Sequence, residues 1–264
     1  MKTILAATLG GLLLSNMALA DDCRQQLPEW IEQAHPGYAP DRTLQDERGD
    51  YRVDADESIC KVWPARTHLT LVASRLVREE HEGYGEADLE VMVFDTARHT
   101  LLARRVEPNL LNWDALRVDA IAFDTALYRL RGDDLAFGVR VSWRGSWNAD
   151  LFQEDRLNLY ELDGQQLHPL LHELPMFSVW GQWDDKCAGE FNNVKRVLIL
   201  TERVGNNGYR DLLFKQARVE SRYAQVAGEC RIVERSTHRA EFPIEYGEDR
   251  YLLPIEFVSE PGVP

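Results

Sequence analysis

Residues 88–106 read DLEVMVFDTARHTLLARRV, and this stretch decides the fold class. Apolar residues dominate from Leu89 to Phe94, and a second apolar run from Thr100 to Val106 follows a short polar turn. Two short runs of this kind, rich in branched and aromatic residues, are typical of antiparallel strands joined by a turn. We therefore predict a β-hairpin here.

The same pattern continues on both sides of this hairpin. Further strand-like runs are short and bounded by Gly, Asp and Asn, and no long helical stretch separates them, which disfavours a parallel sheet. We expect strands at His68–Val77, Leu116–Phe123, Leu135–Trp143, Arg156–Leu162, Leu167–Leu171, Val194–Thr201, Asp211–Val219 and Arg231–Glu234. The sequence predicts an all-β fold of mainly antiparallel strands.

A weak internal repeat bears on how these strands are arranged. The string Phe-Asp-Thr-Ala occurs at residues 94–97 and again at residues 123–126, and residues 160–164 are a looser third copy. In each copy we expect an Asp to end a strand, where its side chain can bond back to the turn backbone. Such hairpins occur in propeller blades, sandwiches and meanders. A propeller-like arrangement and a sandwich or meander therefore both remain open.

One stretch ahead of the strands predicts a short helix. Apolar residues recur there at helical spacing, at Leu27, Trp30, Ile31 and Ala34. Pro28 suits the first turn of a helix, and His35-Pro36-Gly37 would end it. From Gly37 to Glu57 the chain is polar and rich in turn residues, so we expect a long irregular arm there.

The amino terminus has the parts of a cleavable secretory signal peptide. Lys2 precedes an apolar run from about Ile4 to Leu14, and Ala18-Leu19-Ala20 supplies a small-x-small cleavage site. This run is shorter than the roughly 20 residues that a membrane-spanning helix requires. We expect cleavage after Ala20, export to the periplasm or the medium, and no membrane insertion after cleavage.

These expectations divide the chain into three parts. Residues 1–20 are the signal peptide, residues 21–66 are the amino-terminal helix and irregular arm, and residues 67–264 are an antiparallel β body. The alternative is one continuous domain over residues 21–264. Either arrangement is long enough to bury a sizeable core.

Four cysteines follow the predicted cleavage site: Cys23, Cys60, Cys187 and Cys230. An even number of cysteines in an exported protein predicts disulfides, and four cysteines allow three connectivities. The spacing favours two local bridges, Cys23–Cys60 and Cys187–Cys230. We expect the second bridge to stabilise the fold more, because it joins strands of the β body.

The formal net charge of the chain is −14. This charge argues against nucleic acid and anionic lipid as partners, since proteins that bind them concentrate positive charge. Solubility alone explains an acidic surface. The sharper hypothesis is a cationic protein of the cell envelope as the partner.

Motifs for catalysis or metal binding are absent from the sequence. His168 and His172 are four positions apart, but Pro169 disfavours a helix there, and on a strand about 13 Å would separate them. Nucleophile elbows, zinc-binding helices and phosphate loops are also missing. We therefore predict no catalytic residue, no metal and no cofactor.

Two tryptophan-rich segments are the candidate binding surface. Their aromatic faces stand beside polar turn residues, and Trp suits a binding surface because it joins a large apolar area to a hydrogen-bond donor. The candidate residues are Trp143, Trp147, Asp150, Trp180, Trp183, Asp184 and Asp185. The alternative is that these tryptophans cover the ends of the β core.

Two classes of function follow. The first is an exported, soluble, disulfide-stapled, non-catalytic binding protein of the cell envelope. Its more specific form is an inhibitor or immunity-type protein for a cationic enzyme. The alternative is a periplasmic or secreted hydrolase that uses paired carboxylates on a β scaffold.

Overall fold

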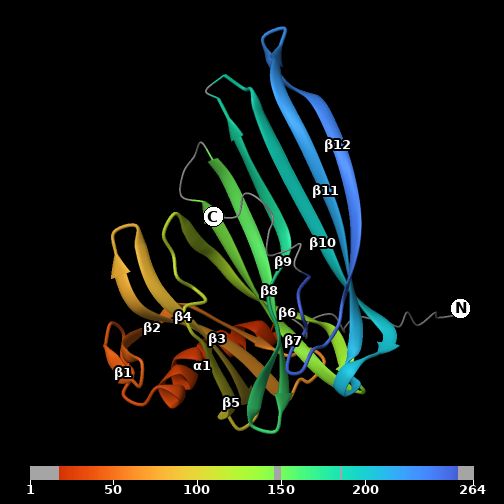
Figure 1. Cartoon of the computed structure of the whole chain (residues 1–264). Coiled ribbons are helices and arrows are strands. Elements are labelled where there is room, and N and C mark those ends of the chain that lie inside the picture. Colours follow the sequence, from red (N-terminus) through yellow and green to blue (C-terminus); the bar gives the residue numbers. More distant parts are fainter. Residues whose placement is uncertain (1–17, 146–149, 185, 255–264) are drawn as a thin grey trace, which may run out of the picture.

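The computed structural model of the protein consists of long antiparallel strands and one helix (Figure 1). It describes residues 18–145, 150–184 and 186–254. The elements are α1 (Ala18–Ala34), β1 (Leu44–Asp46), β2 (Gly49–Val62), β3 (Leu69–His81), β4 (Tyr84–Asp95), β5 (Thr100–Glu107), β6 (Leu116–Arg131), β7 (Asp134–Gly145), β8 (Asp150–Asp163), β9 (Gln166–Trp183), β10 (Gly189–Val204), η1 (Asn206–Gly208), β11 (Arg210–Val226) and β12 (Glu229–Ile244). Each strand run that we predicted overlaps one of these strands, and the all-β antiparallel fold is confirmed.

The strands form two meanders. One sheet has five strands in the order β1-β2-β3-β4-β5, and the other has seven in the order β12-β11-β10-β9-β8-β7-β6. Neighbours in the chain are therefore neighbours in the sheet, as short turns between antiparallel strands allow. The sequence left open a propeller-like arrangement and a sandwich or meander, and the structure shows meanders. The seven-stranded sheet curls into a half-barrel (Figure 1).

An apolar core joins the two sheets. Its fully buried members include Leu71, Leu89 and Val91 of the five-stranded sheet, Phe137, Val139 and Tyr160 of the seven-stranded sheet, and Trp63, which follows β2. Along β4 the residues alternate, so that Leu89 and Val91 face this core while Met92 and Phe94 face the other side of the five-stranded sheet.

Helix α1 covers that other side. Its buried side chains Cys23, Leu27, Trp30, Ile31 and Ala34 recur at helical spacing and pack on Val53, Val72, Leu76, Met92 and Phe94. The helix begins earlier than we predicted, so Pro28 lies in its interior instead of in its first turn. Pro28 is exposed, and on the solvent side water can bond to the carbonyl that its missing N–H leaves free.

The irregular arm that we expected from Gly37 to Glu57 is wrong for most of its length. After Asp41 the chain forms β1, turns at Glu47-Arg48, and continues as β2, which is hydrogen-bonded to β3. Sequence patterns did not identify β2 because few of its side chains, such as Tyr51 and Val53, are buried, and these lie on one face. Asp54, Asp56 and Glu57 lie at a bulge, where the strand is polar. The division of the chain at residue 66 stays a prediction.

Both disulfides have the predicted pairing, Cys23–Cys60 and Cys187–Cys230. The first fastens α1 to β2. The second fastens the turn between β9 and β10 to the start of β12. Two disulfides in an all-β fold are typical of a protein that folds in an oxidising, extracytoplasmic compartment.

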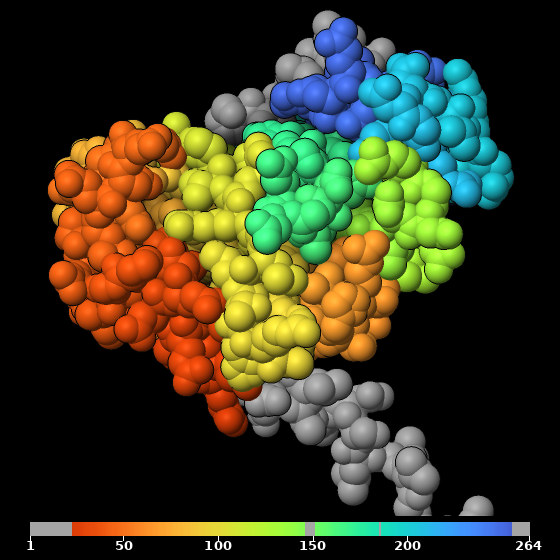
Figure 2. All heavy atoms as spheres, turned by 90° about the horizontal axis from the view of Figure 1, so that it is seen from below, coloured from red at the N-terminus to blue at the C-terminus, as the bar shows by residue number. Residues whose placement is uncertain are grey.

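The far end of the seven-stranded sheet carries a second core. Leu157, Leu159 and Leu174 of β8 and β9 meet Leu212 and Phe214 of β11 there. The segment after β12 closes this end: the Tyr251 N–H donates to the Leu170 carbonyl at 2.8 Å, and the Asn206 side chain donates to the Tyr246 carbonyl at 2.8 Å. Figure 2 shows this last segment, in blue, beside the β10–β11 connection, in cyan.

Candidate binding surface

The three described tryptophans that we singled out, Trp143, Trp180 and Trp183, do not share one face of the seven-stranded sheet. Residues that pair across antiparallel strands share a face, and Trp180 pairs with Phe152. Phe152 and Trp143 are buried members of the core between the sheets. Trp180 packs against this core, and the guanidinium of Arg218 lies 5.3 Å from its ring centroid. Trp143 and Trp180 therefore face inward, and we leave them out of the binding surface.

Trp183 lies on the outer face, where half of its surface is exposed. Its ring meets Phe191 edge-on at 5.0 Å between centroids, and Phe191 meets Tyr223 edge-on at 5.2 Å. Aromatic pairs with this geometry contribute about 0.5–1.5 kcal/mol beyond their buried area. The row therefore holds Trp183 in place while it leaves the ring open to solvent.

Two glycines make room for this aromatic row. A Cβ at Gly181 would come within 2.3 Å of the Phe191 ring, and one at Gly189 would come within 2.7 Å of the Trp183 Cβ. Real side chains do not approach so closely. The two rings can lie against the sheet only because these positions lack a side chain.

Next to the row lies a groove of about 520 Å³ on the outer face of β8–β12, which we call the outer groove. Cross-strand pairing places Leu151, Gly181, Phe191, Ser221 and Arg235 in one line across the five strands. The apolar floor consists of Leu151, Val179, Phe191, Val219, Tyr223 and Ile232. A concave surface that combines apolar side chains with a few polar groups is typical of a ligand site.

The charges of the outer groove have one sign. Lys195 and Arg235 line it, and no Asp or Glu among the described residues does. Neither cation has an ion pair or hydrogen bond among the described residues, and the same holds for Arg239, which pairs across the strands with Ala217. The inner face of the same strands is different: there Arg222 lies 2.9 Å from Glu234, and Arg218 lies 3.0 Å from Glu220.

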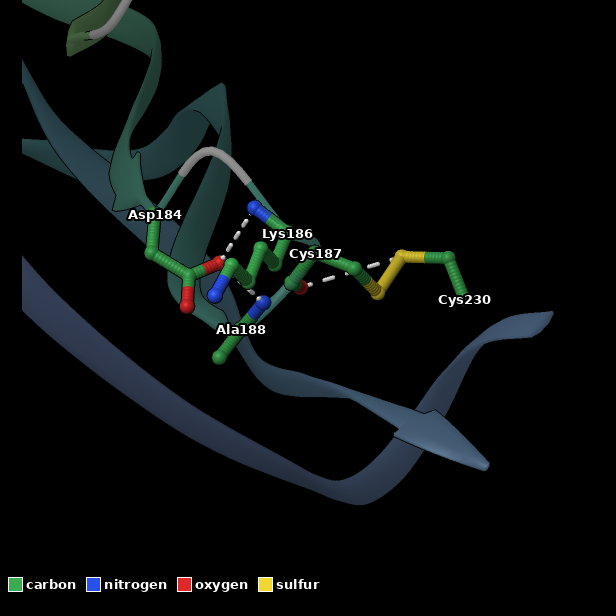
Figure 3. The surroundings of a disulfide bond; sticks show 5 residues. All are labelled: Asp184, Lys186, Cys187, Ala188 and Cys230. Carbon is green, nitrogen blue, oxygen red and sulfur yellow. Dashed lines mark hydrogen bonds between the residues drawn. A yellow bond between two sulfur atoms is a disulfide. The ribbon is translucent and has the colours of Figure 1, made fainter. Parts of the chain in front are cut away.

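Asp184 shapes the turn beside the groove. Its Oδ1 accepts hydrogen bonds from the Lys186 N–H at 2.9 Å and the Ala188 N–H at 2.7 Å. Figure 3 shows this carboxylate turned toward both amides, next to the Cys187–Cys230 bridge. Because Asp side chains that bond to the following backbone stabilise turns, we assign Asp184 a structural role.

The remaining candidate residues are described in part or not at all. Trp147 and Asp185 lie outside the described residues. The backbone of Asp150 pairs with Gln182 at the start of β8. Of the seven candidates, Trp183 is therefore the one whose side chain the structure places on the outer face.

Buried carboxylates bear on the hydrolase alternative. Asp88 and Glu90 lie two positions apart on β4, and both side chains are fully buried. Asp88 lies 2.7 Å from Arg78 and 2.6 Å from Arg48, while Glu90 contacts Arg104 and lies 2.8 Å from His35. Carboxylates so fully paired and away from any open cavity stabilise the fold and do not attack a substrate.

A smaller pocket of about 130 Å³ is lined by Arg105, Glu107, His172 and Arg250. It offers one carboxylate, which is paired with Arg105, and glycoside hydrolysis requires two. Tyr160 is buried nearby, and burial, with the negative charge of Glu107, raises the pKa of its hydroxyl well above its ordinary value. Such a phenol stays protonated and cannot serve as a base at neutral pH.

Two further findings concern the described residues only. No group of three His, Cys, Asp or Glu side chains in them is placed to hold a metal ion. In the same part of the chain, no helix has the length and apolar character needed to cross a membrane.

Sequence reasoning missed most of the outer groove. Phe191, Asn193 and Lys195 alternate with inward-facing residues on β10, a signal that points to one shared face. The partners on β11 and β12 could not be assigned, because a shift of one residue in the register would move each side chain to the other face.

The chain matches no known protein family, no curated protein and no solved structure.

Proposed function

We propose that this chain is an exported, non-catalytic binding protein of the cell envelope that holds its ligand in the outer groove. The observation that carries the proposal is the half-exposed Trp183, fixed by Phe191 and Tyr223 at the end of an apolar groove. A rigid exposed aromatic beside a concave apolar surface is typical of the centre of a binding site.

The disulfides and the amino terminus support the exported part of the proposal. Both bridges are of the kind that forms outside the cytoplasm. The predicted cleavage after Ala20 leaves Cys23 in the mature protein, where it is buried in the α1 core. Export and folding are therefore compatible.

The test uses protein purified from its native compartment. Components that remain bound are released with organic solvent and identified by mass spectrometry, for the wild type, Trp183→Ala and the control Leu127→Ala. Leu127 is a suitable control because it is an exposed apolar residue that lies on β6, outside both candidate surfaces. We expect a component that is retained by the wild type and by the Leu127 variant, and that is depleted at least fivefold in the Trp183 variant. Equal recovery from all three proteins would contradict the proposal.

A specific observation favours a second candidate, the inhibitor of a cationic enzyme. The tip of the β3–β4 hairpin presents Tyr84, 52% exposed, among Glu79, Glu80, Glu82 and Glu86. Tyr84 is stacked on His81 at 4.6 Å between ring centroids. An exposed aromatic anchor surrounded by negative charge suits a cationic cleft, because the charge steers the encounter and the ring supplies buried area.

This second candidate has its own test. Immobilised wild-type protein, Tyr84→Ala and Glu82→Lys/Glu86→Lys are exposed to an envelope extract at about 50 mM and about 500 mM salt. Capture of one basic protein at low salt, lost in both variants, would support the inhibitor function. Capture that is unaffected by the variants would rule out the hairpin as its surface.

A further inference from the structure

We infer that the ligand of the outer groove is a free, single-chain anionic amphiphile, namely a long-chain carboxylate. This inference rests on the proposed function, since it names the ligand class of the same groove. It follows from the groove's floor, its length and the charge of its lining.

Each of the five strands contributes at least one apolar side chain to the floor, and polar residues such as Asn193 and Ser221 lie between them. Leu151 is at one end on β8 and Ile232 is at the other on β12, and both side chains are close to half exposed. Val197 and Ile199 continue the same face along β10. Covering this surface with an alkyl chain stabilises the complex by roughly 25 cal/mol per Å² of apolar area removed from water.

The length of the groove matches one acyl chain. From β8 to β12 there are four interstrand spacings of about 4.8 Å, or roughly 19 Å in total. A single acyl chain covers half of a bilayer core of about 30 Å, which is roughly 15 Å. A chain of this length covers about three of the four spacings, so that with its tail at β8 its headgroup lies near β11, between Lys195 on β10 and Arg235 on β12.

A peptide fits this groove less well. The backbone groups of β8–β12 in the floor are already paired with one another in the ladders. A peptide crossing the strands would leave its own N–H and C=O groups without partners over the apolar floor, which costs free energy for each group. An alkyl chain has no such groups.

The charge of the lining selects the headgroup. Lys195 and Arg235 line the groove, Arg239 lies in the same line across the strands as Lys195, and none of the three has an ion pair or hydrogen bond within the described residues. A carboxylate placed between them gains charge-assisted hydrogen bonds. The net charge of −14 does not reveal these three cations, although Asp155 on β8 lies in the same line across the strands as Lys195. Our expectation from net charge that the protein avoids anionic lipids therefore does not extend to this groove.

The test compares two amphiphiles of equal chain length by titration calorimetry. Laurate carries an anionic headgroup, and dodecyltrimethylammonium carries a cationic one; both are used below the concentration at which they form micelles. Delipidated wild-type protein is compared with Ala217→Trp, which fills the floor, and with Lys195→Glu/Arg235→Glu, which reverses the charge of the lining. The matched control is Arg117→Glu/Arg129→Glu, which changes the net charge equally at exposed residues of β6, outside the groove. Circular dichroism establishes that each variant is folded.

We expect the wild type and the control to bind laurate at least tenfold more tightly than the cationic amphiphile. Ala217→Trp should weaken laurate binding at least tenfold, and the Lys195/Arg235 variant should lose the preference for laurate. Equal binding of the two amphiphiles by the wild type, an unchanged affinity in Ala217→Trp, or no laurate binding would overturn the inference.

Failure of the inference and failure of the proposed function give different results. If laurate does not bind but the native protein retains a Trp183-dependent component of another class, the groove is a binding site and the ligand class is wrong. If laurate does not bind and no Trp183-dependent component is found, both are wrong.

Discussion

At the scale of single residues, the two copies of the Phe-Asp-Thr-Ala repeat place their Asp residues, Asp95 and Asp124, in different surroundings. Asp95, in the first copy, ends β4 and accepts hydrogen bonds from the Ala97 and Arg98 N–H groups, as the sequence indicated. Asp124, in the second copy, lies instead at a bulge inside β6, where it accepts from the Ala126 N–H and from Arg140 at 2.6 Å. Burial acts to raise its pKa, but Arg140 and these hydrogen bonds outweigh it, and the pKa is lowered.

The lowered pKa predicts a pH dependence with a definite sign. The folded protein favours ionised Asp124, so its stabilisation is present above the unfolded pKa of about 3.9 and is lost as the pH falls through the folded pKa. Asp124→Asn should lower the free energy of unfolding by about 1.5–3 kcal/mol at pH 7 and should show a smaller further loss between pH 5 and pH 2 than the wild type. Urea unfolding at several pH values measures both. The control Asp119→Asn, in a partly exposed pair with Arg144, should change the stability by less than about 1 kcal/mol.

Glu90 offers a second test at this scale. Its side chain is fully buried between His35 and Arg104, and removing one partner of such a group leaves the others desolvated and unpaired. Glu90→Ala should lower the free energy of unfolding by about 3–5 kcal/mol, whereas Glu86→Ala, exposed on the same strand, should change it by about 0.5 kcal/mol or less. Similar effects of the two substitutions in denaturant unfolding would show that this network does not stabilise the fold.

At the scale of elements, the sequence predicted where strands occur but not how long they are. β12 was expected over Arg231–Glu234 and extends over Glu229–Ile244, because most of its side chains are exposed on both faces and carry no apolar alternation. β2 was missed for the same reason, with one face buried over a few residues only. Both strands are specified by hydrogen bonding to the strand that adjoins them in the chain, and the apolar pattern of the strand itself does not contain that information.

The structure also revises the expected contributions of the two disulfides. Both close loops of similar size, with separations of 37 and 43 residues, so a chain-entropy argument gives each about 4 kcal/mol. Cys23, however, is buried in the core beneath α1, while Cys230 is exposed at the tip of the sheet. Cys23→Ala/Cys60→Ala should therefore lower the thermal midpoint more than Cys187→Ala/Cys230→Ala. A larger effect of the second pair would restore the expectation drawn from the sequence.

At the scale of the whole molecule, we expect residues of the outer groove to contribute to ligand binding and little to the stability of the fold. The five-stranded sheet contains the fully buried, arginine-paired carboxylates Asp88 and Glu90, while the outer groove lies on the projecting strands β8–β12 (Figure 1). Trp183→Ala should therefore reduce ligand binding with a change in the free energy of unfolding of less than about 1 kcal/mol, since half of the ring is already in water. A larger loss of stability would show that this tryptophan belongs to the core.

Export is the other prediction at this scale. The mature protein should begin at Asp21, because Ala18-Leu19-Ala20 ends the predicted signal peptide. Amino-terminal sequencing of the protein recovered from the periplasm or the medium measures this directly. An intact Met1, or a lipid on Cys23, would contradict it.

The central claim, that the outer groove is the ligand-binding site, is tested most directly by a crystal structure of the mature protein purified from its native compartment and crystallised with laurate. We predict continuous density across β8–β12, with the alkyl chain over Phe191 and Val219 and the carboxylate paired with Lys195 or Arg235. A groove that contains only water, in crystals where no neighbouring molecule covers it, would contradict the claim.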